Sequence, residues 1–375
     1  MFALDFAVNG YVCMKILYII TGLGIGGAER QVLDLADRFS EQGHTVGICY
    51  ITGPVLLQPK NKNIKLIGLG LNKSLVGFVK GVLKLRSIIK AFNPDVVHAH
   101  MVHANLFSRI VRLICPIKKL VNTAHSTNEG GRARMLAYRL THALADVSTN
   151  VTLEAVKVFE QKKACPVGSM QAVPNGIDTE LFKPDPIARN LIRTSECVGD
   201  HEELIVAVGR LVDAKDYRNL LSAFSELSKI RPNIKLWIVG DGPERKQLDD
   251  LVSHLGVDHL VRFLGVRSDV SRIYNAADLY VLSSAWEGFG LVVAEAMASE
   301  KIAVVTDCGG VKEVLGECGY LVPPNNSLAL MEAMNTALEL DPLESIKISG
   351  LARHRIVNNY SIHEIVNVWT KIYSS

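Results

Sequence analysis

Hydrophobic residues recur along the first half of the chain in two alternating patterns, short apolar runs and longer stripes with helical spacing. The runs KILYII, TVGICYI, DVVHAH and KLVNTAH are rich in β-branched residues and predict strands. Between the first two runs, Ala28, Val32, Leu35, Ala36 and Phe39 recur at the spacing of one helix face. Because strands alternate with helices, we expect a mostly parallel sheet with helices on both faces.

A segment rich in loop-forming residues, VPNGIDTELFKPD at 173–185, interrupts this pattern and is predicted to link two domains. The alternation then restarts with the predicted strands LIVAVG, KLWIVG, DLYVLSS and IAVVTD. An apolar helix stripe from Tyr217 to Leu227 follows the first of them. The pattern predicts the α/β class, with two Rossmann-like, doubly wound domains. Such domains bind ligands at the carboxyl ends of their strands, so an interdomain cleft is the expected active site.

The expected boundaries are residues 14–175 for the first domain and 176–360 for the second. Residues 1–13 are predicted to be an N-terminal extension, because Met14 stands directly before the first strand. The extension lacks the basic start of a signal peptide, and no apolar run reaches the ~18 residues of a membrane span. The seven cysteines are scattered and odd in number, which favours the reducing cytoplasm over a disulfide framework.

The net charge of the 375 residues is only +3, but it is unevenly distributed. Residues 1–175 hold 21 Lys and Arg against 10 Asp and Glu, whereas the remainder hold 20 against 28. This excess fits a first domain that faces anionic lipid, a lipid diphosphate or nucleic acid. Residues 75–91 predict a basic amphipathic helix, which suits an anionic membrane surface but also an ordinary solvated helix. Nucleic acid is not expected, because aromatic residues are only 6% and no recognition motif occurs.

The segment TGLGIGGAER follows the first predicted strand and spells G-x-G-x-x-G with Gly22, Gly24 and Gly27. A dinucleotide site also needs an acidic residue about 20 positions later, at the end of the second strand. No Asp or Glu lies between Glu41 and Asp95, so NAD is disfavoured. The glycines still permit close approach to an anion at a helix start, and a tight turn without a ligand is the plainer alternative.

The segment WEGFGLVVAEAMA carries two carboxylates around a glycine loop that begins a helix. Glu287 lies in the loop, Gly288–Gly290 lead into the helix, and Glu295 falls in its second turn. Unpaired N–H groups at such a helix start favour phosphate, and the two glutamates can accept bonds from sugar hydroxyls. Arg210 and Lys215, which follow an earlier strand, would suit a departing diphosphate. The alternatives are a capped surface helix and solvated surface charges.

These residues resemble the retaining glycosyltransferases of family 4, which have the two-domain GT-B fold. GIGGAER, VHAHMVHAN, NTAHS, VPNGID, VGRLVDAK and EGFGLVVAEAMA stand in the order of that family, so the resemblance covers nearly the whole chain from Met14. The sequence of the first half is also similar to that of bacterial enzymes that extend O-antigen or capsular units on undecaprenyl diphosphate. The resemblance also implies that the last helix, within 361–375, crosses back onto the first domain.

The resemblance implies a role for each matching residue. Glu295 would bind the ribose diol, Glu287 a hydroxyl of the donor sugar, and His125 would lie beside that sugar. The acceptor hydroxyl would attack on the face that the diphosphate leaves, with a diphosphate oxygen taking its proton. The implied catalytic residues are His125, Arg210, Lys215 and Glu287, and the donor-binding residues are Gly26, Gly27, Arg210, Lys215, Glu287, Gly288, Phe289, Gly290, Leu291 and Glu295.

A histidine cluster in HAHMVH raises the question of a metal. His98 and His100 would point to the same side of a strand end, but no second His or Cys cluster completes a zinc site. We interpret His100 and His103 as acceptor-binding or structural residues, and Arg132 as a ligand of the acceptor diphosphate or part of a basic surface. The sequence contains no D-x-D, so no metal site and no cofactor are predicted.

The sequence and the resemblance together predict a metal-independent retaining glycosyltransferase of the hexosyltransferase type. It would transfer a hexose or N-acetylhexosamine from a UDP-sugar to an undecaprenyl-diphosphate-linked saccharide in the synthesis of O-antigen or capsule. The expected location is the inner face of the cytoplasmic membrane, as a peripheral protein. Two alternatives remain open: another GT-B enzyme, such as a UDP-sugar epimerase or a phosphorylase, and a non-catalytic protein that binds nucleotide sugars.

Overall fold

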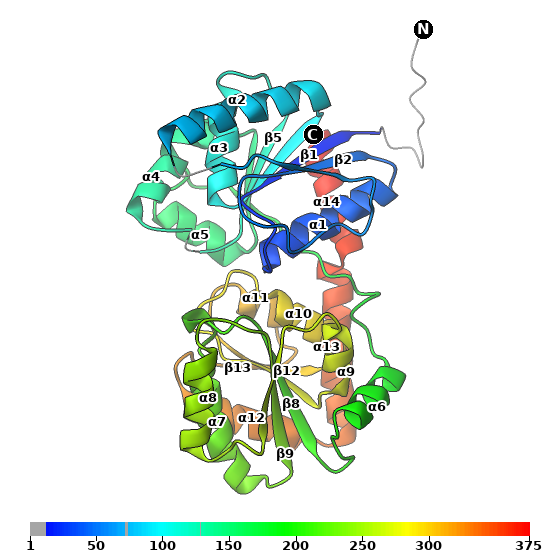
Figure 1. Cartoon of the computed structure of the whole chain (residues 1–375). Coiled ribbons are helices and arrows are strands. Elements are labelled where there is room, and N and C mark those ends of the chain that lie inside the picture. The colour runs from blue at the N-terminus through cyan, green and yellow to red at the C-terminus, as the bar shows by residue number, and fades with distance from the viewer. Residues whose placement is uncertain (1–12, 72–73, 128) are drawn as a thin grey trace. The chain divides into compact units, whose positions relative to one another are not determined.

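The computed structural model describes residues 13–71, 74–127 and 129–375, which form two compact units (Figure 1). One unit comprises the chain up to Gly176 together with Ile362–Ser375, and the other comprises Ile177–Ser361. Most of the N-terminal extension, residues 1–12, lies outside the described residues. Cys13, its last residue, donates a hydrogen bond from its thiol to the carbonyl oxygen of Gly43.

The first unit is built on a parallel sheet with the strand order β3-β2-β1-β4-β5-β6-β7. The four strands predicted from the first-half sequence are confirmed as β1, β2, β4 and β5. The strands are β1 (Lys15–Ile20), β2 (Thr45–Tyr50), β3 (Lys65–Gly68), β4 (Val96–His100), β5 (Leu120–Ala124), β6 (Val147–Asn150) and β7 (Gln171–Ala172). The helices are α1 (Gly27–Glu41), α2 (Leu75–Phe92), α3 (Val102–Arg112), α4 (Arg132–Thr141), η1 (His142–Leu144), α5 (Leu153–Gln161) and α14 (Ile362–Ser374).

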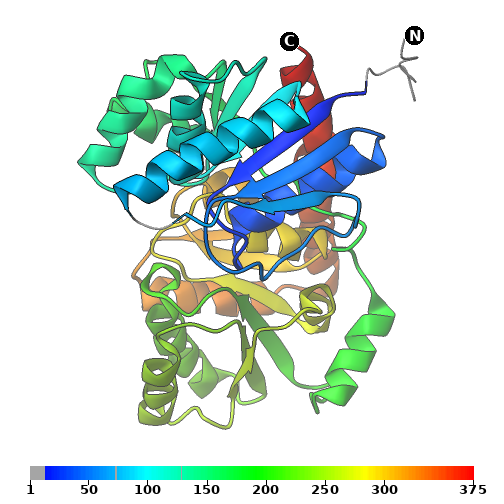
Figure 2. The same ribbon diagram turned by 45° about the horizontal axis from the view of Figure 1, so that its top comes forward.

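Side chains of β1 alternate between two apolar layers, as the two-residue repeat of a strand requires. Ile16 and Tyr18 pack in the layer that contains residues of α1 and α14, whereas Leu17 and Ile19 pack in the layer that contains residues of α2 and α3. The chain's last helix, α14, buries Trp369 against α1 and lies beside it in both views (Figures 1 and 2). The predicted doubly wound arrangement is thus present in this unit.

The second unit repeats the plan with the parallel strand order β10-β9-β8-β11-β12-β13. The predicted strands of the second half are confirmed as β8, β9, β11 and β12. The strands are β8 (Glu203–Val208), β9 (Ile234–Val239), β10 (Val261–Gly265), β11 (Leu279–Leu282), β12 (Ile302–Thr306) and β13 (Tyr320–Val322). The helices are α6 (Pro186–Ser195), η2 (Asp213–Lys215), α7 (Tyr217–Ile230), α8 (Arg245–Leu255), α9 (Val270–Ala276), α10 (Leu291–Ala298), α11 (Val311–Leu315), α12 (Ser327–Leu338) and α13 (Pro342–Tyr360).

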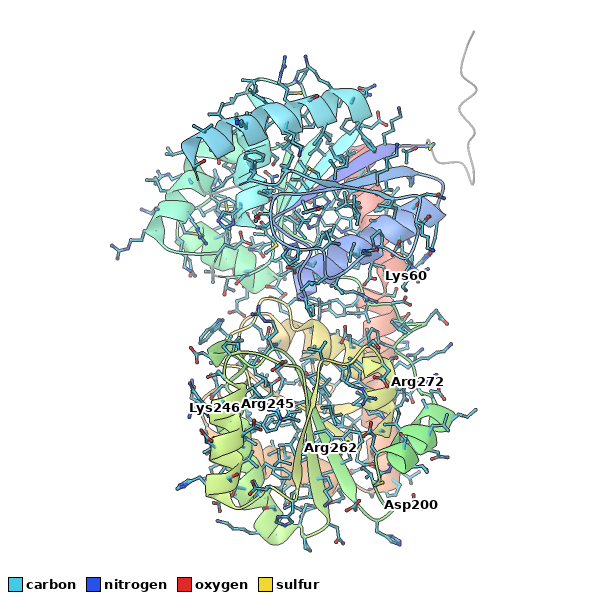
Figure 3. All side chains as sticks on the ribbon, viewed as in Figure 1. Lys60, Asp200, Arg245, Lys246, Arg262 and Arg272 are labelled. Atoms are coloured by element: carbon cyan, nitrogen blue, oxygen red, sulfur yellow. The ribbon has the colours of Figure 1, made fainter. Side chains whose placement is uncertain are left out.

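Alternation in β8 again supplies two layers, with Ile205 packed toward residues of α7 and α12 and Val206 toward residues of α6 and α9. Charged residues gather at the periphery instead. The exposed side chains labelled in Figure 3 include Lys60, Asp200, Lys246, Arg262 and Arg272.

The strand orders also determine where each sheet can bind a ligand. In each sheet the order reverses direction at one point, between β1 and β4 in the first unit and between β8 and β11 in the second. Open parallel sheets bind ligands outside the carboxyl ends of the strands at such a switch point. In the second unit this point is flanked by residues 209–216 and 283–290, which contain six of the ten predicted donor-binding residues: Arg210, Lys215, Glu287, Gly288, Phe289 and Gly290.

Candidate active site

Two loops of the second unit are joined at the switch point by hydrogen bonds. The amide of Ala285, after β11, donates to the carbonyl oxygen of Ala214, after β8, at 2.9 Å. The hydroxyl of Ser283 donates to the carbonyl oxygen of Lys215 at 2.8 Å. The residues VDAK and SSAWEG, which are far apart in the sequence, therefore form one continuous surface at the edge of the sheet.

Lys215 and Glu287, which were assigned separate roles from the sequence, form an ion pair in the structure. Lys215 Nζ donates to Glu287 Oε1, which also accepts a 2.8 Å bond from the hydroxyl of Ser284. Both side chains are largely covered, with 17% and 14% exposed. An ammonium has three N–H donors and a carboxylate has two oxygens, so the pair retains capacity to bind an anionic oxygen and a hydroxyl.

The hydroxyl groups near this pair remain protonated at neutral pH. Tyr217 donates its hydroxyl to the carbonyl oxygen of Gly209, and Tyr280 lies buried in β11. Burial raises the pKa of both tyrosines, and the negative charge of Glu287 raises it further. The buried tyrosine hydroxyls next to the ion pair are therefore neutral and add no negative charge to the site.

Glycines at the ends of neighbouring strands allow the loops to meet backbone to backbone. A Cβ at Gly309, after β12, would collide with the carbonyl oxygen of Glu287, and one at Gly240, after β9, with that of Gly209. Both glycines have positive φ, +57° and +134°. Sequence reasoning missed this support, although GDGPE and DCGG directly follow strands and were visible signals.

The helix α10 begins at the other side of Glu287. Gly290 occupies its N-cap with a φ of +84°, and Phe289 is buried, stacking edge-on against Tyr360. The first amides of any helix lack intrahelical acceptors, so those of Leu291 and its neighbour are suited to an anion. Glu295 lies one turn further along, where its Oε2 accepts a 3.1 Å bond from the hydroxyl of Tyr274. That tyrosine was not predicted.

The other predicted donor-binding residues are less tightly held. Arg210 is exposed at the beginning of the loop after β8. In the first unit, Gly26 caps α1 with an extended backbone and Gly27 is the first residue of the helix. The glycine loop therefore makes the strand-to-helix turn that its pattern indicated. The closure of Gly26 and Gly27 over a diphosphate stays a prediction.

Three histidines lie together at the carboxyl ends of β4 and β5. The rings of His98 and His100 are 4.0 Å apart between centroids, which confirms that they share one side of the strand. His100 Nδ1 lies 2.9 Å from Nε2 of His125. His100 is only 1% exposed, whereas His125 is partly exposed, so any effect of His100 on a bound acceptor would pass through another residue.

The main chain of His125 is held by a buried carboxylate that sequence reasoning missed. The His125 amide donates to Glu129 Oε1 at 2.8 Å, and the hydroxyl of Tyr138 donates to Oε2. Asn105 donates to the same hydroxyl oxygen, and burial raises the pKa of Glu129. The buried Arg109, which bonds to Asn122 Oδ1, lies over the Tyr138 ring. No motif in the sequence indicated this carboxylate, because its bonds to His125 and Tyr138 arise from the fold of the chain.

The remaining predicted acceptor residues lie on the surface of the first unit. His103 is exposed in the first turn of α3, and Arg132 is exposed as the first residue of α4. Their proposed contacts with an acceptor stay predictions. Across the described part of the chain, no group of three or more His, Cys, Asp and Glu residues has an arrangement that could hold a metal ion.

Family descriptions match both halves of the chain. "Glycosyltransferase Family 4" matches residues 25–181 and "Glycosyl transferases group 1" matches residues 189–354. The chain belongs to glycosyltransferase family 4. As a family 4 protein it has the GT-B fold, in agreement with the solved structure of HepE from Anabaena in complex with UDP. That structure is 23% identical, with a TM-score of 0.85 over 96% of this chain and 100% of that chain.

Relatives of similar length carry varied descriptions. An uncharacterized glycosyltransferase of Haemophilus influenzae is 27% identical over 96% of this chain and 99% of its own. The N-acetyl-alpha-D-glucosaminyl L-malate synthase of Bacillus anthracis is 25% identical over 93% and 94%. Its family and these relatives together show that the chain is a glycosyltransferase.

Within the described residues, no helix is both long and apolar enough to cross a membrane.

Replacing Gly309 by Ala should destabilise the packing of the loops that follow β11 and β12, because the new Cβ would collide with the Glu287 carbonyl at a positive φ. We expect a loss of about 1–3 kcal/mol in the free energy of unfolding, measured with urea. Gly350→Ala is the matched control, because nothing lies within 4 Å of the added Cβ in α13. Equal stability of the two variants would contradict the described packing of these loops.

Acid should weaken the first unit through its buried histidines. Burial lowers the pKa of His125 to about 4 and lowers those of His98 and His100 well below 6.5. The unfolded state therefore binds more protons, and stability is lost as the pH falls from 6.5 toward 4. His125→Gln should reduce this slope by up to about 1.4 kcal/mol per pH unit, measured by hydrogen exchange of β4 and β5 amides. The exposed His201→Gln should keep the slope, and an unchanged slope in His125→Gln would refute the assignment.

Proposed function

We propose that this glycosyltransferase is a retaining, metal-independent enzyme that transfers a hexose or N-acetylhexosamine from a UDP-sugar to a polyprenyl-diphosphate-linked saccharide. The product would be a unit of a cell-surface polysaccharide such as O-antigen or capsule. The observation that carries the proposal is the meeting of Lys215, Glu287 and the start of α10 at one edge of a parallel sheet. The cation and the amides at the start of the helix suit the diphosphate of a nucleotide sugar, and the carboxylate suits a hydroxyl of its sugar.

The donor would bind to the second unit in an extended manner. The amides that begin α10 and the ammonium of Lys215 would hold the diphosphate, Glu287 a sugar hydroxyl and Glu295 the ribose diol. Tyr274 donates to Oε2 of Glu295, which holds the carboxylate beside the beginning of α10. The HepE structure determined with UDP-glucose, at 23% identity, supports the choice of a uridine nucleotide.

Charge stabilisation would replace a metal ion in this reaction. Negative charge builds up on the leaving diphosphate, and Arg210, Lys215 and the positive end of the α10 dipole would neutralise it. A diphosphate oxygen would take the proton of the attacking acceptor hydroxyl on the same face of the sugar, so that the anomeric configuration is retained. The contribution of the protein is orientation and electrostatic stabilisation.

The acceptor would bind to the first unit, whose sequence carries the positive excess. Helix α2 buries Leu85 and Ile89 but exposes Val79 and Leu83, 51% and 55%, near the exposed Lys80. Apolar side chains among cations suit the surface of an anionic bilayer, where a polyprenyl carrier resides. We therefore propose peripheral attachment at the inner face of the cytoplasmic membrane.

Incubation with a panel of nucleotide sugars and lipid-linked saccharides should give a product heavier by one sugar, detected by mass spectrometry. We expect UDP-sugars to serve as donors, EDTA to leave turnover unchanged, and NMR of the product to show the donor's anomeric configuration. Transfer to water-soluble carboxylates such as malate, with none to lipid-linked saccharide, would overturn the proposed acceptor. Epimerised donor without transfer would favour the epimerase alternative.

Lys215→Met should lower turnover about a hundredfold, because one charge-stabilising contact to the leaving group is lost. The single change also leaves Glu287 unpaired, so the double variant Lys215→Met with Glu287→Gln separates the two effects. Glu287→Gln alone measures the loss of the proposed sugar contact. If Lys215 acts on the diphosphate, the double variant is slower than Glu287→Gln although its stability recovers. Equal turnover of the double variant and Glu287→Gln would make the charge of Lys215 merely structural. Arg218→Met, on the neighbouring α7, is the control and should retain activity.

Leu83→Glu combined with Lys80→Glu should weaken binding to vesicles that contain phosphatidylglycerol. Each lysine near an anionic surface contributes about 1 kcal/mol, so reversing one charge and removing an apolar contact should cost tenfold or more. Vesicle sedimentation measures the effect. Leu343→Glu, at an 80% exposed position of α13, serves as the control. Equal binding by the two variants would show that α2 does not contact the membrane.

A further inference from the structure

The rings of His100 and His125 are joined by a hydrogen bond in which the two nitrogens share a single proton. His100 Nδ1 and His125 Nε2 are 2.9 Å apart, so one nitrogen donates and the other must present a lone pair. A neutral imidazole has one N–H and one bare nitrogen, and the choice made at this contact therefore determines the far nitrogen of each ring. The direction of one hydrogen bond sets which group His125 offers to a ligand.

The surroundings of His100 decide that direction. Its Nε2 is buried and has no hydrogen-bond partner among the residues that the structure describes. A proton on Nε2 would be a buried donor without an acceptor, and such orphaned donors are rarer in proteins than under-satisfied acceptors. The proton of His100 therefore belongs on Nδ1, from which it is donated to His125.

The neighbouring histidine cannot reverse this arrangement. His98 uses both ring nitrogens elsewhere, Nδ1 with the hydroxyl of Tyr373 at 2.6 Å and Nε2 with that of Thr123 at 2.7 Å. The His98 ring lies against His100 without bonding to it. His98, with both ring nitrogens hydrogen-bonded, thus packs against His100, the residue that directs His125.

The main chain of His125 is fixed independently. Its amide donates to the buried Glu129, whose carboxylate also accepts from Tyr138. Among the described residues, the ionisable groups near His125 include His98 and His100 from β4 and Glu129 at its amide. Arg134 donates to the carbonyl oxygen of Glu129, and Lys162 to that of Thr127 in the same loop. Burial keeps the pKa of His125 at about 4, so its ring carries a single proton at neutral pH.

We propose that His100 is a positioning residue that fixes the tautomer of His125, so that His125 presents its Nδ1–H as a neutral hydrogen-bond donor to an oxygen of the sugar substrate. This inference rests on the proposed function for the presence of that sugar. With Nε2 occupied and Nδ1 protonated, the ring has no lone pair to offer the ligand. His125 therefore does not remove a proton from the acceptor, and the diphosphate oxygen remains the group that does so.

NMR of the whole protein with 15N-labelled histidine tests the tautomer without any substrate. We expect protonated Nδ1 and bare Nε2 for both His100 and His125 at pH 7, with resonances assigned by substitution. A protonated Nε2 on His125, or a doubly protonated ring, would overturn the inference. Because this readout needs no turnover, it stands whether or not sugar transfer to a lipid-linked acceptor is observed.

Two variants at position 100 separate positioning from packing. His100→Asn can place an amide N–H near the position of Nδ1, whereas His100→Leu fills space without a donor. We expect the Asn variant to keep the His125 tautomer and most of the transfer rate. The Leu variant should populate Nε2–H on His125 and lose about tenfold in kcat/KM, as for the loss of one hydrogen bond. Equal tautomer populations in the two variants would refute the role of His100.

Discussion

The ion pair between Lys215 and Glu287 joins the two loops that flank the switch point of the second sheet, and neighbouring residues of these loops are arranged around it. Ser284 bonds to the carboxylate, and Gly309 lets the next loop contact the backbone at Glu287. Largely covered ion pairs recover little net free energy, because both charges lose water. The pair lies at the edge of a parallel sheet where ligands bind, so it fits the proposed donor binding better than a role in stability.

In the first unit, neutral groups form the hydrogen-bonded network next to the candidate site. His98, Thr123 and Tyr373 form a buried chain of hydrogen bonds beneath His100 and His125. Such networks fix one geometry only when nearly every member is satisfied. Helix α14 contributes Tyr373 to this network from the end of the chain, so the carboxyl terminus supports the residues at the ends of β4 and β5. The last helix thus supports His98, whose ring packs against His100.

The sequence predicted the architecture because parallel strands buried on both faces leave uninterrupted apolar runs, and eight such runs became strands. It also indicated Glu287 and Lys215, since each stands just beyond a strand. Their mutual pairing could not be read from the sequence, because it depends on β8 lying next to β11, 71 residues later at Leu279 rather than in the next strand along the chain. Glu129 and Tyr274 were missed for a related reason: their partners come from packing and not from local patterns.

Hydrogen exchange of the intact protein with and without UDP tests the central claim most directly, because it reports where the diphosphate binds. We expect slower exchange in amides of residues 209–216 and 284–294, around Lys215, Glu287 and the beginning of α10, because fixed dipoles and cations there would hold the nucleotide. Unchanged exchange in both segments at saturating UDP, or protection confined to the glycine loop at 22–27, would contradict it.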